Sequence, residues 1–101
     1  LESSFPDMIV ILNDMFNVLK IHNLNPYIFP YQERILMDVN PWGILSPETA
    51  TIAYKAYKEA LTTKSLVTTE IKFEEYEKRK DIQVRFYVVQ KYVICFIREK
   101  D

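Results

Sequence analysis

The sequence has 101 residues, of which 49% are apolar and 27% charged, so it can form one compact domain, whereas two domains would need roughly 50 residues for each core. Its apolar runs, such as residues 8–12, are far shorter than the roughly 20 residues that span a bilayer. This argues against a membrane protein and predicts a cytoplasmic one, or a nuclear one in a eukaryote. Single copies of cysteine, histidine and glycine (Cys95, His22 and Gly43) exclude an internal disulfide, a Cys/His zinc site and a Gly-rich phosphate loop, so we expect no metal and no cofactor.

The formal net charge is −1, but the charges are unevenly distributed along the chain. Residues 1–45 carry a net charge of −3, and residues 46–101 carry +2. Any basic surface must therefore come from the second half, provided that folding gathers its positive side chains on one face.

The first segment predicts a helix over residues 5–21, with Ser4 and Asp7 placed as in a capping box. Its apolar residues surround most of the helix, so it must be covered on most sides. One cover is a second subunit, which makes a homodimer with this helix in the interface. The alternative is the central core helix of a monomer. The predicted interface residues are Met8, Leu12, Met15, Phe16 and Leu19.

Asparagines and prolines interrupt residues 22–45 and predict turns at 22–26 and 40–45. Between these turns, residues 31–39 form either a helix started by Pro30 or a strand over 34–39, and we favour the helix. The aromatic side chains of this region either anchor an interface or close the core. They are Tyr27, Phe29, Tyr31 and Trp42.

A helix over residues 47–63 is the clearest signal in the sequence. Ser46 is an N-cap residue, Pro47 suits the first helical position, and Glu48 complements the free amides of the first turn. Helical spacing places small and apolar residues on an inner face that suits packing against another helix: Ala50, Ala53, Ala56, Tyr57, Ala60 and Leu61. The opposite, partly basic face carries Thr51, Lys55, Lys58 and Thr62.

Residues 66–88 predict an antiparallel hairpin, because apolar and polar residues alternate over 66–77 and again over 82–88. The hairpin tip is basic, with Lys78, Arg79 and Lys80. The tail, residues 89–97, is apolar at successive positions and predicts a buried continuation or a further strand, with a terminal helix as the weaker alternative.

The residues that could carry catalysis are few, and we expect no catalytic site and no enzyme. His22 lies at the end of the first predicted helix, where a structural role is favoured, and Cys95 lies in an apolar run where a thiol is an inert packing group. The glutamates of residues 70–77 form a solvated face, with Lys72 and Arg85 as their cross-strand partners.

Residues 46–88, a capped helix followed at once by a hairpin with a basic tip, resemble the second half of a winged helix-turn-helix domain. The resemblance implies a small α+β domain in which two to three helices pack on an antiparallel hairpin or small sheet. It also implies that helix 47–63 enters the major groove while the wing contacts the DNA backbone. The positions that would bind DNA are Thr51, Lys55, Lys58, Thr62, Lys78, Arg79 and Lys80.

Two functions follow from these patterns. The first is a non-enzymatic, dimeric protein of winged-helix type that binds double-stranded DNA, with a role in a plasmid, phage or transcriptional complex. The alternative is a protein–protein interaction module or complex subunit without nucleic-acid binding, which uses the apolar first segment and the exposed aromatics.

Overall fold

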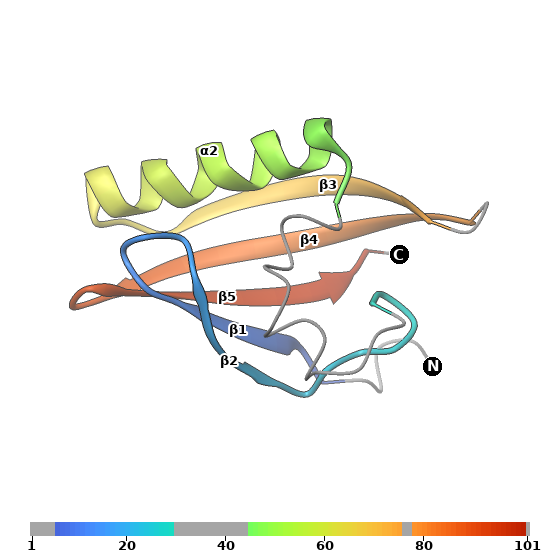
Figure 1. The fold of residues 1–101 in the computed structure, drawn as a ribbon, viewed down its shortest axis with the longest axis horizontal. Coiled ribbons are helices and arrows are strands. Elements are labelled where there is room, and N and C mark those ends of the chain that lie inside the picture. The colour runs from blue at the N-terminus through green and yellow to red at the C-terminus, as the bar shows by residue number, and fades with distance from the viewer. Residues whose placement is uncertain (1–5, 30–44, 76–77, 101) are drawn as a thin grey trace.

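The computed structural model describes residues 6–29, 45–75 and 78–100. These residues form one antiparallel sheet with strand order β2-β1-β5-β4-β3 and one long helix. Figure 1 shows α2 lying alongside β3, with the other strands in succession beneath it. In chain order the elements are β1 (Met8–Leu12), β2 (Val18–His22), α2 (Pro47–Thr63), β3 (Val67–Glu75), β4 (Lys78–Val89) and β5 (Tyr92–Glu99).

The prediction of helix 47–63 is confirmed in its bounds and in its cap. The Ser46 side chain accepts a hydrogen bond from the Thr49 N–H at 3.2 Å, and Pro47 occupies the first turn. The helix ends at Lys64, which takes the left-handed conformation (φ 55°) and donates its N–H to Ala60 O at 2.8 Å. Within the described residues, α2 contacts the strands β3, β4 and β5, so the face with the buried alanines, predicted to pack against another helix, packs on the sheet there.

The hairpin and the strand after it are confirmed as β3, β4 and β5. The β3–β4 register runs from Val67 opposite Phe86 to Glu75 opposite Lys78. The basic residues 78–80 belong to β4 itself rather than to the tip. β5 lies between β1 and β4 at the centre of the sheet, where both of its edges are hydrogen-bonded.

The prediction of a helix over residues 5–21 is wrong, because the described part of that segment forms strands β1 and β2 joined by a tight turn. Asn13 makes this turn: its side chain accepts the N–H groups of Met15 and Asn17, and Phe16 has a positive φ of 64°. The β-branched residues 9–11 favour a strand, and β5 supplies partners for the whole of β1, so tertiary pairing outweighs the apolar pattern that suggested a helix.

Residues 31–39, for which we favoured a helix, lie outside the described residues. The segment before them turns at Asn25, whose carbonyl accepts the N–H groups of Ile28 and Phe29. Both of these side chains belong to the core.

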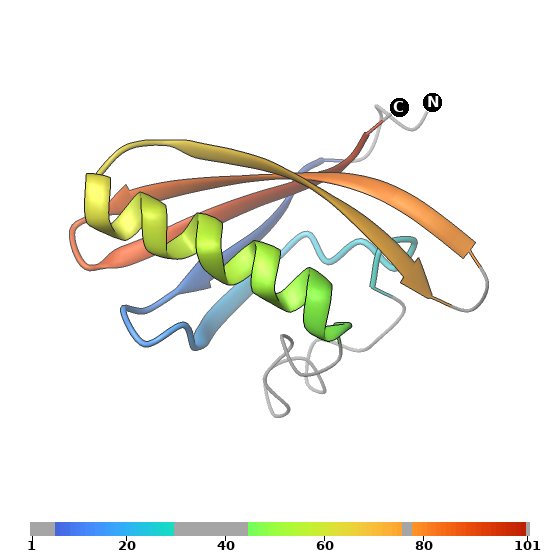
Figure 2. The same ribbon diagram turned by 90° about the horizontal axis from the view of Figure 1, so that it is seen from above.

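The core lies between the sheet and α2, which crosses one face of the strands (Figure 2). Alternate residues of each inner strand point into it, and the antiparallel register sets them opposite one another: Met8 and Ile97, Val10 and Cys95, Leu12 and Val93. The described residues form a five-stranded antiparallel sheet crossed by one long helix, where two to three helices on a hairpin or small sheet were expected. The winged-helix fold class is therefore wrong.

Candidate functional site

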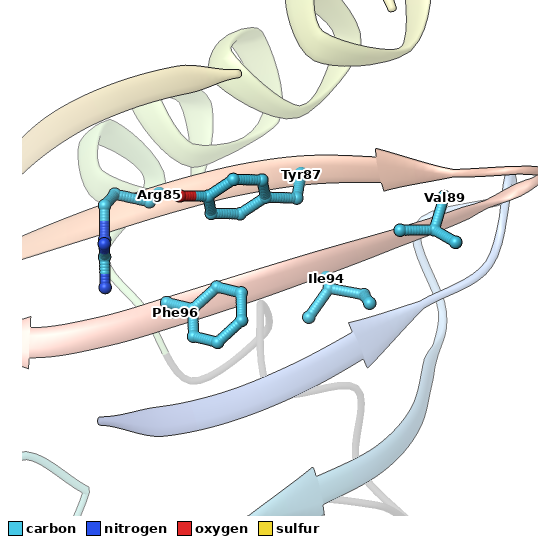
Figure 3. A pocket seen from close by; sticks show the side chains of 5 residues that line it. All are labelled: Arg85, Tyr87, Val89, Ile94 and Phe96. Atoms are coloured by element: carbon cyan, nitrogen blue, oxygen red, sulfur yellow. The ribbon is translucent and has the colours of Figure 1, made fainter. Parts of the chain in front are cut away.

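The face of the sheet turned away from α2 carries an open groove of about 280 Å³. Its lining is mostly apolar and comes from the two central strands β4 and β5 (Figure 3). The lining residues are Arg85, Tyr87, Val89, Ile94 and Phe96.

Strand alternation explains why these side chains share one face. On β4 and β5 the neighbouring residues in sequence, such as Phe86 and Cys95, point to the core and are fully buried. The register then sets Arg85 opposite Phe96 and Tyr87 opposite Ile94. Since β1 places Ile9 opposite Phe96 and Ile11 opposite Ile94, the half-buried apolar surface continues onto a third strand.

Aromatic contacts fix the middle of the groove. The rings of Tyr87 and Phe96 meet edge to face, with centroids 5.2 Å apart and an interplanar angle of 83°. The guanidinium of Arg85 lies over the Phe96 ring at 5.4 Å from its centroid, a cation–π arrangement. The groove thus has a charged end at Arg85 and an apolar end at Val89 and Ile94, as Figure 3 shows.

One carboxylate holds the charged end in place. Asp7, just before β1, accepts Arg85 Nη2 on its Oδ2 at 2.5 Å. Arg98 of β5 reaches the same carboxylate with Nε at 3.1 Å and Nη2 at 3.2 Å. Arg85, expected to pair with the glutamates of β3, pairs instead with Asp7, and Glu70 binds Lys100 at 2.6 Å.

The predicted DNA-binding residues do not form one described surface. Thr51, Lys55, Lys58 and Thr62 are exposed on the outer side of α2. The Lys80 ammonium donates a hydrogen bond to Tyr27 O, and its Nζ lies 5.6 Å from the centre of the Tyr27 ring. These contacts join β4 to the segment after β2. The side chains of Lys78 and Arg79 lie outside the described residues.

The predicted interface residues are divided by the strands on which they lie. Met8 and Leu12 are buried in the core, Phe16 is half-buried, and Met15 and Leu19 are exposed. The homodimer stays a prediction, but Met8 and Leu12 pack within the chain. Of the four aromatics that we weighed as anchors or core, Tyr27 is exposed and Phe29 is buried, while Tyr31 and Trp42 lie outside the described residues.

Tyr57 joins the helix to the β1–β2 turn on the covered side of the sheet. Its hydroxyl donates to Asn13 O at 2.7 Å and accepts the Phe16 N–H at 3.0 Å. Its ring packs on Phe16, with centroids 4.6 Å apart. Desolvation raises the pKa of the Tyr57 hydroxyl, so it stays protonated and serves as a structural bridge.

The structure places the two side chains that were considered for catalysis, Cys95 and His22, on strands of the sheet. Burial raises the pKa of the Cys95 thiol well above its ordinary value, which keeps it protonated and unreactive in the core. His22 is exposed at the end of β2 rather than at a helix end. Within residues 6–29, 45–75 and 78–100, no three His, Cys, Asp or Glu side chains come together to hold a metal ion, and no helix has the length and apolar character needed to cross a bilayer.

The groove residues escaped sequence reasoning. The alternation over residues 82–88 predicts Arg85 and Tyr87 on the polar side of the strand, and the tail with Ile94 and Phe96 is apolar at successive positions. The signal was an aromatic residue at an outward position of β4 beside outward apolar residues of the next strand. Only the β4–β5 register shows that they touch.

No known protein family and no curated protein matches this sequence. Solved structures do match the fold. The PAS domain of the RpfR quorum-sensing receptor of Cronobacter turicensis, solved in complex with BDSF, superposes with a TM-score of 0.77 over 95% of each chain at 18% identity. A PAS domain from Desulfitobacterium hafniense gives a TM-score of 0.70 at 19% identity, covering 96% of this chain and 95% of that one.

An animal PAS domain is similar as well. The PAS-B domain of Cycle from Drosophila melanogaster, solved with bound ethylene glycol, gives a TM-score of 0.73 at 11% identity, covering 92% of this chain and 99% of the other. The chain therefore has a PAS-like α+β fold: a five-stranded antiparallel sheet with one long helix across it in the described residues.

This fold replaces the winged helix-turn-helix resemblance, which is wrong. The local order of a capped helix and a hairpin is common to both folds, and the difference lies in β1, β2 and β5, which complete the sheet. The prediction of double-stranded DNA binding is wrong with it, because α2 is a helix packed along a sheet and not a recognition helix, and the structural neighbours are PAS domains.

Proposed function

We propose that this chain is a non-enzymatic signalling module that binds a protein segment on the open face of its sheet. The observation that carries this proposal is the groove itself. Ile94 and Phe96 lie half-buried on the face opposite α2, in a lining that is almost wholly apolar. Connected apolar surface of this kind, left open to solvent, is typical of a docking site for another protein.

The shape of the groove favours a protein segment over a small molecule. Sites for small ligands enclose most of the ligand surface, whereas this groove lies open along the strands. Its apolar surface also continues over Ile9 and Ile11 of β1, which makes it wider than one extended hydrocarbon chain. Because the RpfR domain has also been solved with the fatty acid C12:0, a fatty acid is the small molecule to exclude by experiment.

A pair of photo-crosslinking variants tests this function. The photoreactive residue p-benzoylphenylalanine replaces Tyr87 in the groove or, as a matched control, Tyr54, which is 45% exposed on α2. We expect a discrete protein adduct at position 87 in the cells that make the protein, and none at 54. The substitution Ile94→Asp should abolish the adduct.

A missing adduct at position 87, or equal adducts at both positions, would overturn the proposal. An adduct between two copies of this chain would keep the interaction function and make the partner a second copy.

A further inference from the structure

The ion cluster at the charged end of the groove has two cations and one anion. Arg98 uses both arms of its fork on Asp7, with Nε on Oδ1 and Nη2 on Oδ2, the geometry that a carboxylate prefers with arginine. Arg85 donates to Asp7 through Nη2, and the acceptor is Oδ2, which also accepts a hydrogen bond from Arg98 Nη2. Arg98 can therefore hold Asp7 without Arg85.

Arg85 leaves part of its hydrogen-bonding capacity unused. Its Nε is buried and has no hydrogen-bond partner, which is a cost for a charged donor. The side chain as a whole is 27% exposed and lines the groove, so a small rotation could turn its Nε–Nη fork toward an incoming acceptor. A guanidinium stays charged at any physiological pH and has donors only.

The β2 edge of this face carries positive charge as well, while Glu70 of β3, beside β4, is paired with Lys100. On the same face, β2 places exposed Lys20 opposite Ile11 and exposed His22 opposite Ile9. Asp7 is the carboxylate that faces Arg85 and Arg98 directly. Since the single carboxylate of Asp7 is shared by Arg85 and Arg98, this end of the apolar surface keeps one net positive charge, and Lys20 adds another on the β2 side.

We propose that the partner is an amphipathic segment of another protein that carries a carboxylate, and that this carboxylate binds the Arg85 fork while apolar side chains cover Ile94 and Phe96. This inference rests on the proposed function and adds the chemistry of the partner. A second copy docked face to face is disfavoured, because it would bring Arg85 and Lys20 of both copies onto one interface and like charges would repel.

Peptide selection supplies the probe. A phage-displayed library of random peptides about 16 residues long, roughly four helical turns, is selected on the chain and separately on Arg85→Gln. Peptides selected on the parent chain should carry Asp or Glu at a fixed spacing from an apolar run. Peptides selected on Arg85→Gln should lack this requirement.

A double-mutant cycle then assigns the contact to Arg85. Replacing the conserved acid of a selected peptide by its amide should weaken binding at least about tenfold on the parent chain, and have little effect on Arg85→Gln. The control Lys58→Gln removes an exposed cation on α2 and should leave the tenfold effect intact. Asp7→Asn removes the internal competitor and should tighten binding of the acidic peptide, which a merely structural Asp7 would not do.

Each remaining outcome separates the inference from the function on which it rests. Peptides that lose binding to Ile94→Asp but show no need for an acid would overturn the charge inference and keep the docking face. Peptides that bind Ile94→Asp as well as the parent would overturn both. If decanoate shifts the Ile94 and Phe96 amide resonances in an Arg85-dependent way and no acidic peptide binds, the occupant is a fatty acid and the proposed protein partner is wrong.

Discussion

On β5, Val93, Cys95 and Ile97 face α2 and are at most 5% exposed, whereas Ile94 and Phe96, which alternate with them, face the open groove. The two faces of the sheet are thus built from the same strands, and on β5 both carry large apolar side chains. They differ in what covers them. The inner face has a helix whose alanines allow close approach, and the outer face is left with apolar side chains and a charged cluster at one end.

This difference separates stability from recognition. A buried side chain on the inner face contributes through the solvent that it excludes and the cavity that its loss would leave. A half-buried one on the outer face contributes less to folding and is available to a partner. The predictions that follow test this division, from the largest expected effect to the smallest.

The largest contrast is between two phenylalanines on opposite faces of neighbouring strands. Phe86→Ala should lower the free energy of unfolding by about 3–5 kcal/mol, because Phe86 is fully buried and its loss leaves a cavity. Phe96→Ala should cost about 1 kcal/mol, mainly its contact with Tyr87. Urea denaturation of both variants measures the difference, and equal losses would contradict the division between the faces.

Tyr57 joins the helix to the β1–β2 turn through both its hydroxyl and its ring. Tyr57→Phe keeps the ring but removes the hydroxyl that bridges Asn13 O and the Phe16 N–H, which then keep their longer bond to each other at 3.3 Å. The loss should cost about 1–2 kcal/mol. Hydrogen exchange should show the loss of protection first at Phe16. Tyr54→Phe, at an exposed position on the same helix, is the control and should change little.

Alkaline pH should weaken the inner face selectively. The raised pKa of Cys95 means that the folded chain retains a proton that the unfolded chain loses above its ordinary pKa of about 8.5. The free energy of unfolding should therefore keep its full value below that pH and fall by about 1.4 kcal/mol per pH unit above it. Tyr57 should add to the fall above about pH 10, since burial raises its pKa too.

The substitution Cys95→Ala checks the assignment. In this variant the denaturation midpoint should no longer fall with pH between about pH 8.5 and 10. The variant should also be less stable than the parent at every pH, because it loses the packing of the Cys95 side chain. An unchanged slope would show that another group causes the alkaline loss.

The smallest effect concerns the cap of the helix that covers the inner face. Ser46→Ala removes the acceptor for the Thr49 N–H and the partner of the Thr49 hydroxyl, and should cost about 1 kcal/mol. Thr51→Ala, which loses only an exposed bond to Pro47 O, should cost less than about 0.5 kcal/mol. Thermal denaturation of the two variants side by side measures the difference, and equal shifts would mean that the cap contributes no more than this exposed bond.

Sequence reasoning succeeded where structure depends on near neighbours. The Ser46 cap and the following helix are local, since the cap bonds a residue three positions on. The hairpin of β3 and β4 is also local, because its strands adjoin in sequence and their alternation shows which side is buried. These segments gave the winged-helix resemblance, which was wrong because it rested on less than half of the chain.

Reasoning from the sequence failed where a segment depends on a distant one. Residues 8–12 are all apolar, as in a helix that is buried on every side. They form the strand β1 because β5, from the other end of the chain, supplies their hydrogen-bond partners. The groove was missed for the same reason. Arg85, Tyr87 and Phe96 are ordinary outward strand residues until the register places them side by side.

The sequence alone therefore determined the capped helix 47–63 and the β3–β4 hairpin, and it favoured a strand or buried continuation in the tail. The tertiary structure decided that the first segment is a pair of strands, that α2 packs on a sheet, and that Asp7 meets Arg85 and Arg98 beside the groove. The physical reason is that caps and alternation act between residues a few positions apart. Sheet order and register join residues from opposite ends of the chain, and no local pattern encodes that pairing.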